Sequence, residues 1–285
     1  MKRKIFPRLL TGLFILISAW AILAQFILKY RIKDSVAKQV FSKKGVTLST
    51  GKIFVDGFEM HYTKTGIDTL PTILFVHGSP SGWIVYMKYM QDKELLSKYR
   101  MIAIDRPGFG YSNFGDAKNL DEQSKLINHV VRSIQNGKPI YAVGHSLGGP
   151  MIAKLQVDHE NIFAGLVFLA AALDPGLEEP ERWRHVMQIF PLNYLLPGSF
   201  RPSNEELLYL KTDLKYLDKE WDKITCPVWI IHGTKDTNVP VANVDYAKRK
   251  LTKARSVEVK ILTGADHSIP LNRHDDIKEV LMRLQ

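Results

Sequence analysis

Apolar residues along the chain fall into short runs that alternate with longer segments of helical periodicity. Each run holds about four to eight aliphatic or β-branched residues, which is typical of strands buried on both faces. The runs lie at residues 72–78, 100–108, 140–146, 164–172, 226–233 and 257–267, and the helical segments lie at 84–98, 119–135, 148–158, 241–253 and 274–284. This alternation predicts an α/β fold with a mostly parallel central sheet and helices on both of its faces.

Two regions depart from this alternation. Residues 46–66 alternate apolar and polar positions around the turn residues Gly51, Asp56 and Gly57, which predicts two or three antiparallel strands. Residues 174–222 contain five prolines and several aromatic residues but no run that resembles a buried strand. About fifty residues are too many for a simple connection between two strands, so this segment predicts a small, mainly helical cap.

The N-terminal region carries one continuous apolar stretch, Leu9–Leu28, in which Gln25 is the only strongly polar residue. As a helix it would be about 30 Å long, the thickness of the hydrocarbon core of a bilayer, so we expect a single-pass membrane anchor. A cleaved signal peptide is the alternative, with Ala19, Trp20 and Ala21 as a cleavage site and secretion as the outcome. Basic residues flank both ends, and charge therefore does not fix the side of the membrane.

These patterns divide the chain into four parts. We expect an anchor or signal sequence over residues 1–29, a basic linker over 30–45, an α/β core over 46–173 and 223–285, and the cap over 174–222. The cap thus interrupts the core between two of its strands.

Positive charge is concentrated near the N-terminus. Residues 1–44 hold ten of the 39 basic residues and one of the 29 acidic ones, so the formal net charge of +10 leaves the following body nearly neutral. A nucleic-acid-binding domain needs a basic face of its own, and we expect no nucleic-acid partner. The single Cys226 excludes an intrachain disulfide. We also expect no metal or other cofactor, because no residue cluster has metal-ligand spacing and no phosphate-loop lysine is present.

Candidate chemistry begins at Ser146, which lies between Gly144 and Gly148 after a predicted strand and before a predicted helix. Such a G-x-S-x-G turn holds the serine in strained backbone geometry and exposes its hydroxyl. A serine hydroxyl is a weak nucleophile, so it requires a histidine as base and an acid that orients the histidine. A fold of this kind places the three in the order serine, acid, histidine.

His267 and Asp236 satisfy that order. Each follows a predicted strand, and both are therefore expected at the same edge of the sheet as Ser146. Asp174, directly after another strand, is an alternative acid for the same histidine. The sequence thus predicts Ser146, Asp236 and His267 as the catalytic residues.

An acyl-transfer reaction also needs two N–H donors aimed at the oxyanion. One candidate is the backbone N–H of Leu147, which follows the serine at the start of a helix. The other is the backbone N–H of Ser79, in the "VHGSP" segment that ends a strand at Gly78. Both donors belong to the main chain.

Five ordered motifs resemble the α/β-hydrolase superfamily in its serine-nucleophile branch, from about residue 50 to the end of the chain. They are "HGSP" (77–80), "DRPGFGYS" (105–112), "GHSLGG" (144–149), "HGTKD" (232–236) and "GADH" (264–267). The resemblance implies Ser146 as nucleophile, His267 as base and Asp236 as acid. It also implies Ser79 and Leu147 as oxyanion donors, and supporting roles outside the triad for the residues at His77 and Asp105. The side chain of His145 is expected to point away from the serine hydroxyl.

Hydrolysis of a carboxylic ester through an acyl-enzyme is the leading functional hypothesis. The apolar cap and the expected anchor at residues 9–28 favour a small-molecule ester with an apolar acyl or lipid-like group. Monoacylglycerol-type lipases are a similar group of enzymes, and this comparison rests on analogy.

Other functions occur on the same scaffold. Epoxide hydrolases and haloalkane dehalogenases resemble this chain at "HGSP", but they carry an aspartate where this chain has Ser146. Carbon–carbon bond hydrolases and proline-type aminopeptidases keep a serine. An aminopeptidase would hold the substrate amine with acids of the cap, and the candidates, expected to be solvated, are Glu178, Glu179, Glu181, Glu205 and Glu206. A non-catalytic binding protein on this fold would lack a triad residue, whereas all three are present.

Overall fold

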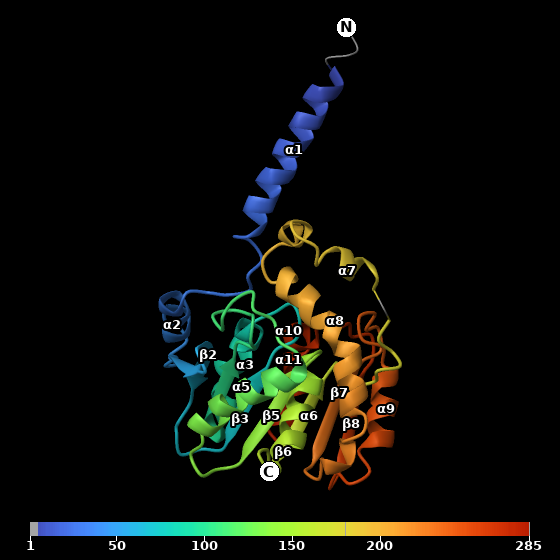
Figure 1. Cartoon of the computed structure of the whole chain (residues 1–285). Coiled ribbons are helices and arrows are strands. Elements are labelled where there is room, and N and C mark those ends of the chain that lie inside the picture. Colours follow the sequence, from blue (N-terminus) through green and yellow to red (C-terminus); the bar gives the residue numbers. More distant parts are fainter. Residues whose placement is uncertain (1–4, 180, 285) are drawn as a thin grey trace.

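The computed structural model describes residues 5–179 and 181–284. Its centre is an eight-stranded sheet with the order β1-β2-β4-β3-β5-β6-β7-β8 (Figure 1). The strands are β1 (Ser49–Val55), β2 (Phe58–Thr65), β3 (Thr72–Val76), β4 (Arg100–Ile104), β5 (Ile140–His145), β6 (Gly165–Leu169), β7 (Val228–Gly233) and β8 (Val257–Leu262). Strands β3 to β8 run parallel, whereas β1 and β2 pair antiparallel at one edge. The predicted α/β fold class is confirmed.

Helices cover both faces of the sheet. Alternate residues of each strand point to opposite faces: Leu74 and Val76 of β3 belong to one core, and Ile73 and Phe75 to the other. The first core is covered by α5 (Leu120–Ser133), α6 (Gly148–Asp158) and α9 (Ala242–Lys250). The second is covered by α2 (Asp34–Ser42), η2 (Trp83–Tyr86), α3 (Met87–Met90), α4 (Lys93–Lys98), α10 (Ile269–Asn272) and α11 (His274–Leu281).

Helix α1 (Ile5–Ala24) projects from the body and is mostly exposed (Figure 1). Within it, Pro7–Ala24 has a mean hydropathy of 1.8, and this stretch is long and apolar enough to cross a membrane. The sequence placed the apolar span at Leu9–Leu28, but the helix ends at Ala24. There the Gln25 amide donates to the backbone oxygens of Ala21 and Tyr194, and the chain turns toward the body.

The expected linker at residues 30–45 contains a helix that the sequence pattern did not indicate. This helix is α2, and Ala37 and Phe41 bury its apolar side against the second core.

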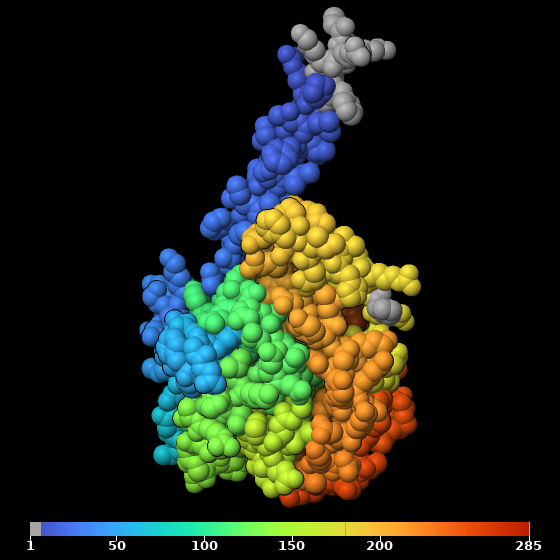
Figure 2. Space-filling model, viewed as in Figure 1, coloured from blue at the N-terminus to red at the C-terminus, as the bar shows by residue number. Residues whose placement is uncertain are grey.

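Residues 174–222, the segment predicted as a cap, lie between β6 and β7. They contain α7 (Trp183–Val186), η3 (Leu192–Leu195), α8 (Phe200–Leu217) and η4 (Trp221–Lys223), in agreement with the predicted helical character. Leu210, Leu214 and Leu217 attach α8 to the first core. The space-filling view shows that the yellow part of the cap lies at the end of the body from which α1 emerges (Figure 2).

Candidate active site

Ser146 lies in a sharp turn between the end of β5 and the start of α6. Its φ of +53° is in the left-handed region that β-carbon-bearing residues rarely adopt. The turn is possible because its neighbours are glycines: a Cβ on Gly144 would overlap the carbonyl oxygen of Gly148, and a Cβ on Gly148 would overlap that of Val76. The strand, helix and serine therefore adopt the turn that the sequence motif predicts.

His267 and Asp236 are brought together by two neighbouring loops, after β8 and after β7. The His267 Nδ1 lies 2.7 Å from Asp236 Oδ2. Asp236 is buried, and its Oδ1 accepts hydrogen bonds from the backbone N–H groups of Asn238 and Val239. Burial raises the pKa of this carboxyl, but hydrogen bonds from His232, His267 and Val239 outweigh it and hold the pKa below its ordinary value. The acid is thus ionised beside the histidine.

Asp174, the alternative acid, is engaged elsewhere. Its Oδ1 accepts a hydrogen bond of 2.7 Å from the backbone N–H of Gly176 and closes a local turn. Its own N–H donates to the side chain of Asn243 in α9. The structure therefore pairs His267 with Asp236 rather than with Asp174.

The segment that carries Ser79 lies against the serine turn. A Cβ on Gly78 would come within 2.8 Å of the Ser146 Cβ, so only glycine allows this approach. Among the residues described, neither the Ser79 nor the Leu147 N–H donates to a protein acceptor. Both N–H groups are available next to the serine.

His145 joins the serine turn to the histidine loop, a contact that the sequence did not predict. Its Nε2 lies 2.9 Å from the backbone oxygen of His267, and the two ring centroids are 4.8 Å apart. Burial lowers the pKa of His145 to about 3, and the neighbouring His267 contributes in the same direction. Within residues 5–179 and 181–284 no hydrogen bond joins the Ser146 hydroxyl to His267. Such bonds are often long in unliganded enzymes.

Arg106 is a second residue whose part in the site the sequence did not predict. It is fully buried, and its guanidinium donates to the backbone oxygens of His77 and Gly78. The same guanidinium contacts both carboxylate oxygens of Glu206, at 2.7 and 2.9 Å. Its backbone N–H donates to His77 Nε2. Arg106 thus fixes the segment before Ser79.

The expectation that Glu206 is solvated is wrong. Glu206 is buried because it shares one face of α8 with Leu210 and Leu214, and Arg106 neutralises its charge. The helical spacing of 206, 210 and 214 is the signal that could have revealed this. Glu179 and Glu181 of the cap are exposed, as expected.

His232 is a third residue whose part in the site the sequence did not predict. Its Nε2 lies 2.9 Å from the backbone oxygen of Val239 and 3.5 Å from Asp236 Oδ2. It packs under the loop that positions the acid. Its place four residues before Asp236, in "HGTKD", was the available signal.

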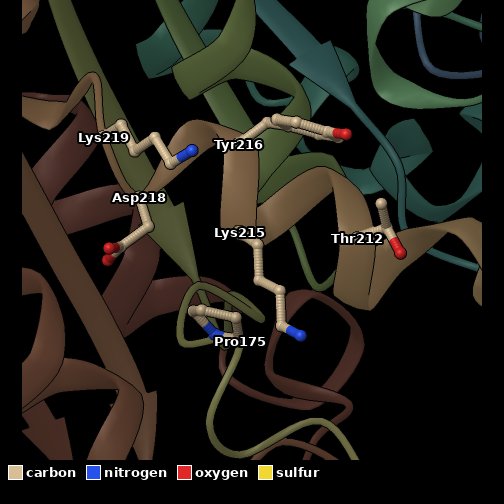
Figure 3. Close-up of a pocket in the computed structure, with 6 residues that line it drawn as sticks. All are labelled: Pro175, Thr212, Lys215, Tyr216, Asp218 and Lys219. Atoms are coloured by element: carbon tan, nitrogen blue, oxygen red, sulfur yellow. The ribbon is translucent and has the colours of Figure 1, made fainter.

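A pocket of about 480 Å³ lies away from these residues, at the C-terminal end of α8 (Figure 3). It is lined by Pro175, Thr212, Lys215, Tyr216, Asp218 and Lys219. None of the residues predicted for catalysis lines it. In the described part of the chain, no group of three or more His, Cys, Asp or Glu side chains is arranged to hold a metal ion.

Comparison with known proteins identifies relatives of this fold. The model of the alpha/beta hydrolase family matches residues 73–280. Epoxide hydrolase 1 of Caenorhabditis elegans is 38% identical over 93 residues, which cover 32% of this chain and 22% of that protein. The probable lysophospholipase BODYGUARD 3 of Arabidopsis thaliana is 22% identical over 283 residues, which cover 77% of this chain and 56% of that protein. The chain therefore spans between about a fifth and just over half of these relatives.

The crystal structure of a membrane phospholipase A, described as a novel bacterial virulence factor, superposes with a TM-score of 0.60 at 18% identity. The match covers 97% of this chain and 99% of that one, and it concerns the fold. Sheet order, the turn at Ser146 and the family match over residues 73–280 agree with one another. The chain belongs to the alpha/beta hydrolase family.

Proposed function

We propose that this protein is a membrane-anchored serine hydrolase that cleaves carboxylic esters with apolar, lipid-like acyl groups. The observation that carries the proposal is the 2.7 Å contact between His267 and Asp236, together with a serine held at a φ of +53° in the turn that His145 links to the His267 loop. A strained serine next to a histidine with an ionised acid partner is the arrangement that activates a hydroxyl.

In this proposal Ser146 Oγ attacks the ester carbonyl, and His267 accepts the hydroxyl proton and passes it to the leaving alcohol. Asp236 accepts the Nδ1–H bond and stabilises the imidazolium that forms. The N–H groups of Ser79 and Leu147 stabilise the oxyanion, and that of Leu147 lies at the positive end of α6. Water then cleaves the acyl-enzyme by the same steps.

Epoxide hydrolysis is a second candidate because an epoxide hydrolase is among the relatives. Opening of an epoxide by a serine oxygen would leave an ether on the enzyme. Water does not cleave an ether at neutral pH with a histidine as base. An acyl group on Ser146 is instead an ester that an activated water hydrolyses. The serine therefore favours esters over epoxides.

Aminopeptidase activity has less support. Of the five cap acids that could bind a substrate amine, Glu206 is not available, because it is buried and paired with Arg106. A lipid-like substrate agrees with the exposed apolar helix α1 and with relatives named a lysophospholipase and a membrane phospholipase A.

A fluorophosphonate probe tests the nucleophile. The folded wild-type protein should be labelled, whereas Ser146→Ala should not, and its turnover should fall by about 10⁵-fold or more. A denatured sample controls for non-specific reaction. Labelling that survives the substitution would exclude Ser146 as the nucleophile.

A series of substrates tests the leaving group and the acyl chain. Esters of increasing acyl length should be cleaved with rising kcat/KM, and matched amides, a peptide and an epoxide should be poor substrates. Ser146→Ala is the control for each compound. A preference for the amide or the epoxide would overturn the ester proposal.

A further inference from the structure

Helix α1 and the cap lie side by side. The Trp20 indole N–H donates to the backbone oxygen of Leu195, at 3.0 Å, and the Gln25 amide donates to that of Tyr194, at 2.8 Å. The backbone N–H of Gly198 donates to the oxygen of Ala24. The η3 turn of the cap is therefore fixed along the C-terminal part of α1.

An apolar groove of about 570 Å³ lies between the surfaces of α1 and η3. Its walls include Phe14, Ile17 and Ile22 on the helix and Pro191, Leu192 and Leu195 on the cap. Phe14 lies ten residues before the end of α1, which corresponds to about 15 Å along the helix axis. The groove thus extends along roughly half of the apolar stretch that is long enough to span a bilayer.

The adjoining surface of the cap is also apolar and exposed. It consists of Trp183, Val186, Ile189 and Phe190, and the Phe190 side chain is the most exposed, at 77%. Soluble proteins rarely leave a contiguous apolar surface of this kind uncovered. In the space-filling view the yellow part of the cap extends from the base of α1 across the adjoining end of the body (Figure 2).

Cations gather where the chain leaves α1. Lys29 Nζ lies 5.0 Å and the Arg31 guanidinium 5.3 Å from the centre of the Phe114 ring. Burial, together with the charges of Arg31 and Arg201, lowers the pKa of Lys29. Basic residues that follow the end of an apolar helix match the headgroup layer of a membrane with anionic lipids.

We infer that the cap segment 183–195 is a membrane-docking surface. It inserts into the leaflet from which α1 emerges, and the groove between α1 and η3 takes a lipid acyl chain of that leaflet. This inference rests on one part of the proposed function, which is that α1 anchors the protein in a membrane. It narrows the proposed substrates to lipids that belong to the same bilayer. The inference is supported by the hydrogen bonds that hold η3 beside α1, because a helix that spans the membrane brings η3 to the level of the acyl chains.

Depth-dependent fluorescence quenching tests the insertion with the full-length protein. Cys226 is the single cysteine, and Cys226→Ala removes it. In that background an environment-sensitive fluorophore is attached to one new cysteine at a time, in the variants Leu16→Cys, Ile189→Cys and Ile67→Cys. Each labelled protein is reconstituted in phosphatidylcholine–phosphatidylglycerol vesicles with or without brominated acyl chains. All three positions are exposed in the protein, and position 67 precedes β3, at the edge of the sheet opposite to the strand ends that carry the candidate site.

Brominated lipid should quench the fluorophores at 16 and 189 several-fold more than the one at 67. Quenching at 16 but not at 189 would overturn the inference and leave the anchor intact. If neither position is quenched, both the anchor and the docking surface are wrong.

Catalysis provides an independent test. The double substitution Ile189→Asp/Phe190→Asp should lower hydrolysis of a long-chain ester in vesicles by about tenfold or more, and leave hydrolysis of a dispersed short-chain ester unchanged. Ile67→Asp, at a similarly exposed site, should change neither rate. Equal loss of both activities would indicate damage to the fold and contradict a docking role. If the wild type cleaves no ester at all, the proposed function fails, whereas the quenching result still decides the docking surface.

Discussion

Asp236 is buried, yet four polar contacts keep its carboxylate ionised. They come from His267, His232 and the backbone N–H groups of Asn238 and Val239. Two of these donors belong to the loop after β7 itself, so the local turn positions the acid before the histidine is added. The charge is thereby available to orient His267 at neutral pH.

Replacement of Asp236 by asparagine should therefore remove most of the activity. We expect Asp236→Asn to lower kcat by about 10³- to 10⁴-fold, because the amide does not stabilise an imidazolium. Asp174→Asn is the matched control and should retain most of the turnover, since the Asp174 carboxylate accepts its hydrogen bond from Gly176 within its own turn. Measurement of kcat on one ester for both variants decides between the two acids. The reverse ranking would assign the acid to Asp174.

The positions of Ser146, Asp236 and His267 in the fold could be predicted from the sequence. Each residue follows an apolar run that is typical of a buried strand, and parallel strands end at one edge of the sheet. The sequence predicted Asp236 as the acid but left Asp174 open as an alternative, because both residues follow strands. The choice depends on which backbone N–H groups each carboxylate meets. The contacts of His145 and Arg106 were not predicted, because they depend on where the backbone oxygens of His267 and His77 lie in the fold.

Helix α8 connects the cap to the segment that carries the candidate oxyanion donor. Glu206 binds Arg106, which in turn binds the backbone oxygens of His77 and Gly78, and the Ser79 hydroxyl donates to that of Ser203. A movement of α8 away from the core would have to break these contacts. Helix α8 is therefore part of the support of the candidate site.

Glu206→Gln tests this connection. The substitution leaves the Arg106 charge buried without a counter-charge, and we expect a loss of about 3 kcal/mol in the free energy of unfolding. For a chain of this size that corresponds to a decrease of about 6–12 °C in the thermal midpoint. Glu179→Gln, at an exposed position of the cap, should leave the midpoint within about 1 °C. Equal midpoints for the two variants would mean that the buried pair contributes nothing to stability.

Most strands and helices could be predicted from the apolar periodicity, because buried strands and amphipathic helices have distinct periods. Two segments were not. Residues 84–98 form η2, α3 and α4 rather than one helix, since Asp92 caps a new helix through the N–H groups of Glu94 and Leu95. Helix α2 was missed because only Ala37 and Phe41 are buried in its nine residues, which is too few for a periodic signal.

Two histidines with lowered pKa values, the fully buried His77 and the half-buried His145, affect the stability of the whole molecule. Burial and the charge of Arg106 lower the pKa of His77 well below its ordinary value, and burial lowers that of His145 to about 3. The unfolded chain binds protons on both residues below about pH 6.5, whereas the folded protein does not. The stability that they contribute is complete above that pH and is lost as the pH falls.

We expect the thermal midpoint to decrease between pH 7.5 and 5.0, with about 2 kcal/mol lost per buried histidine. His145→Gln should reduce this pH dependence, since one titrating group is removed. His185→Gln, an exposed histidine in the cap, should leave it unchanged. Thermal unfolding in detergent at several pH values measures the slope. A midpoint that does not vary over this range would show that neither histidine is kept neutral by the fold.

The connection between α1 and the body has a consequence for how the enzyme encounters its substrates. It is short, and hydrogen bonds from Gln25, Gly198 and Ser199 hold it at both sides. Under the proposed anchoring the body does not swing on a tether, so its orientation to the lipid surface would be set by the tilt of one helix. Encounters then depend on lateral diffusion of lipids in two dimensions, and the relevant substrate concentration is a surface density rather than a molarity.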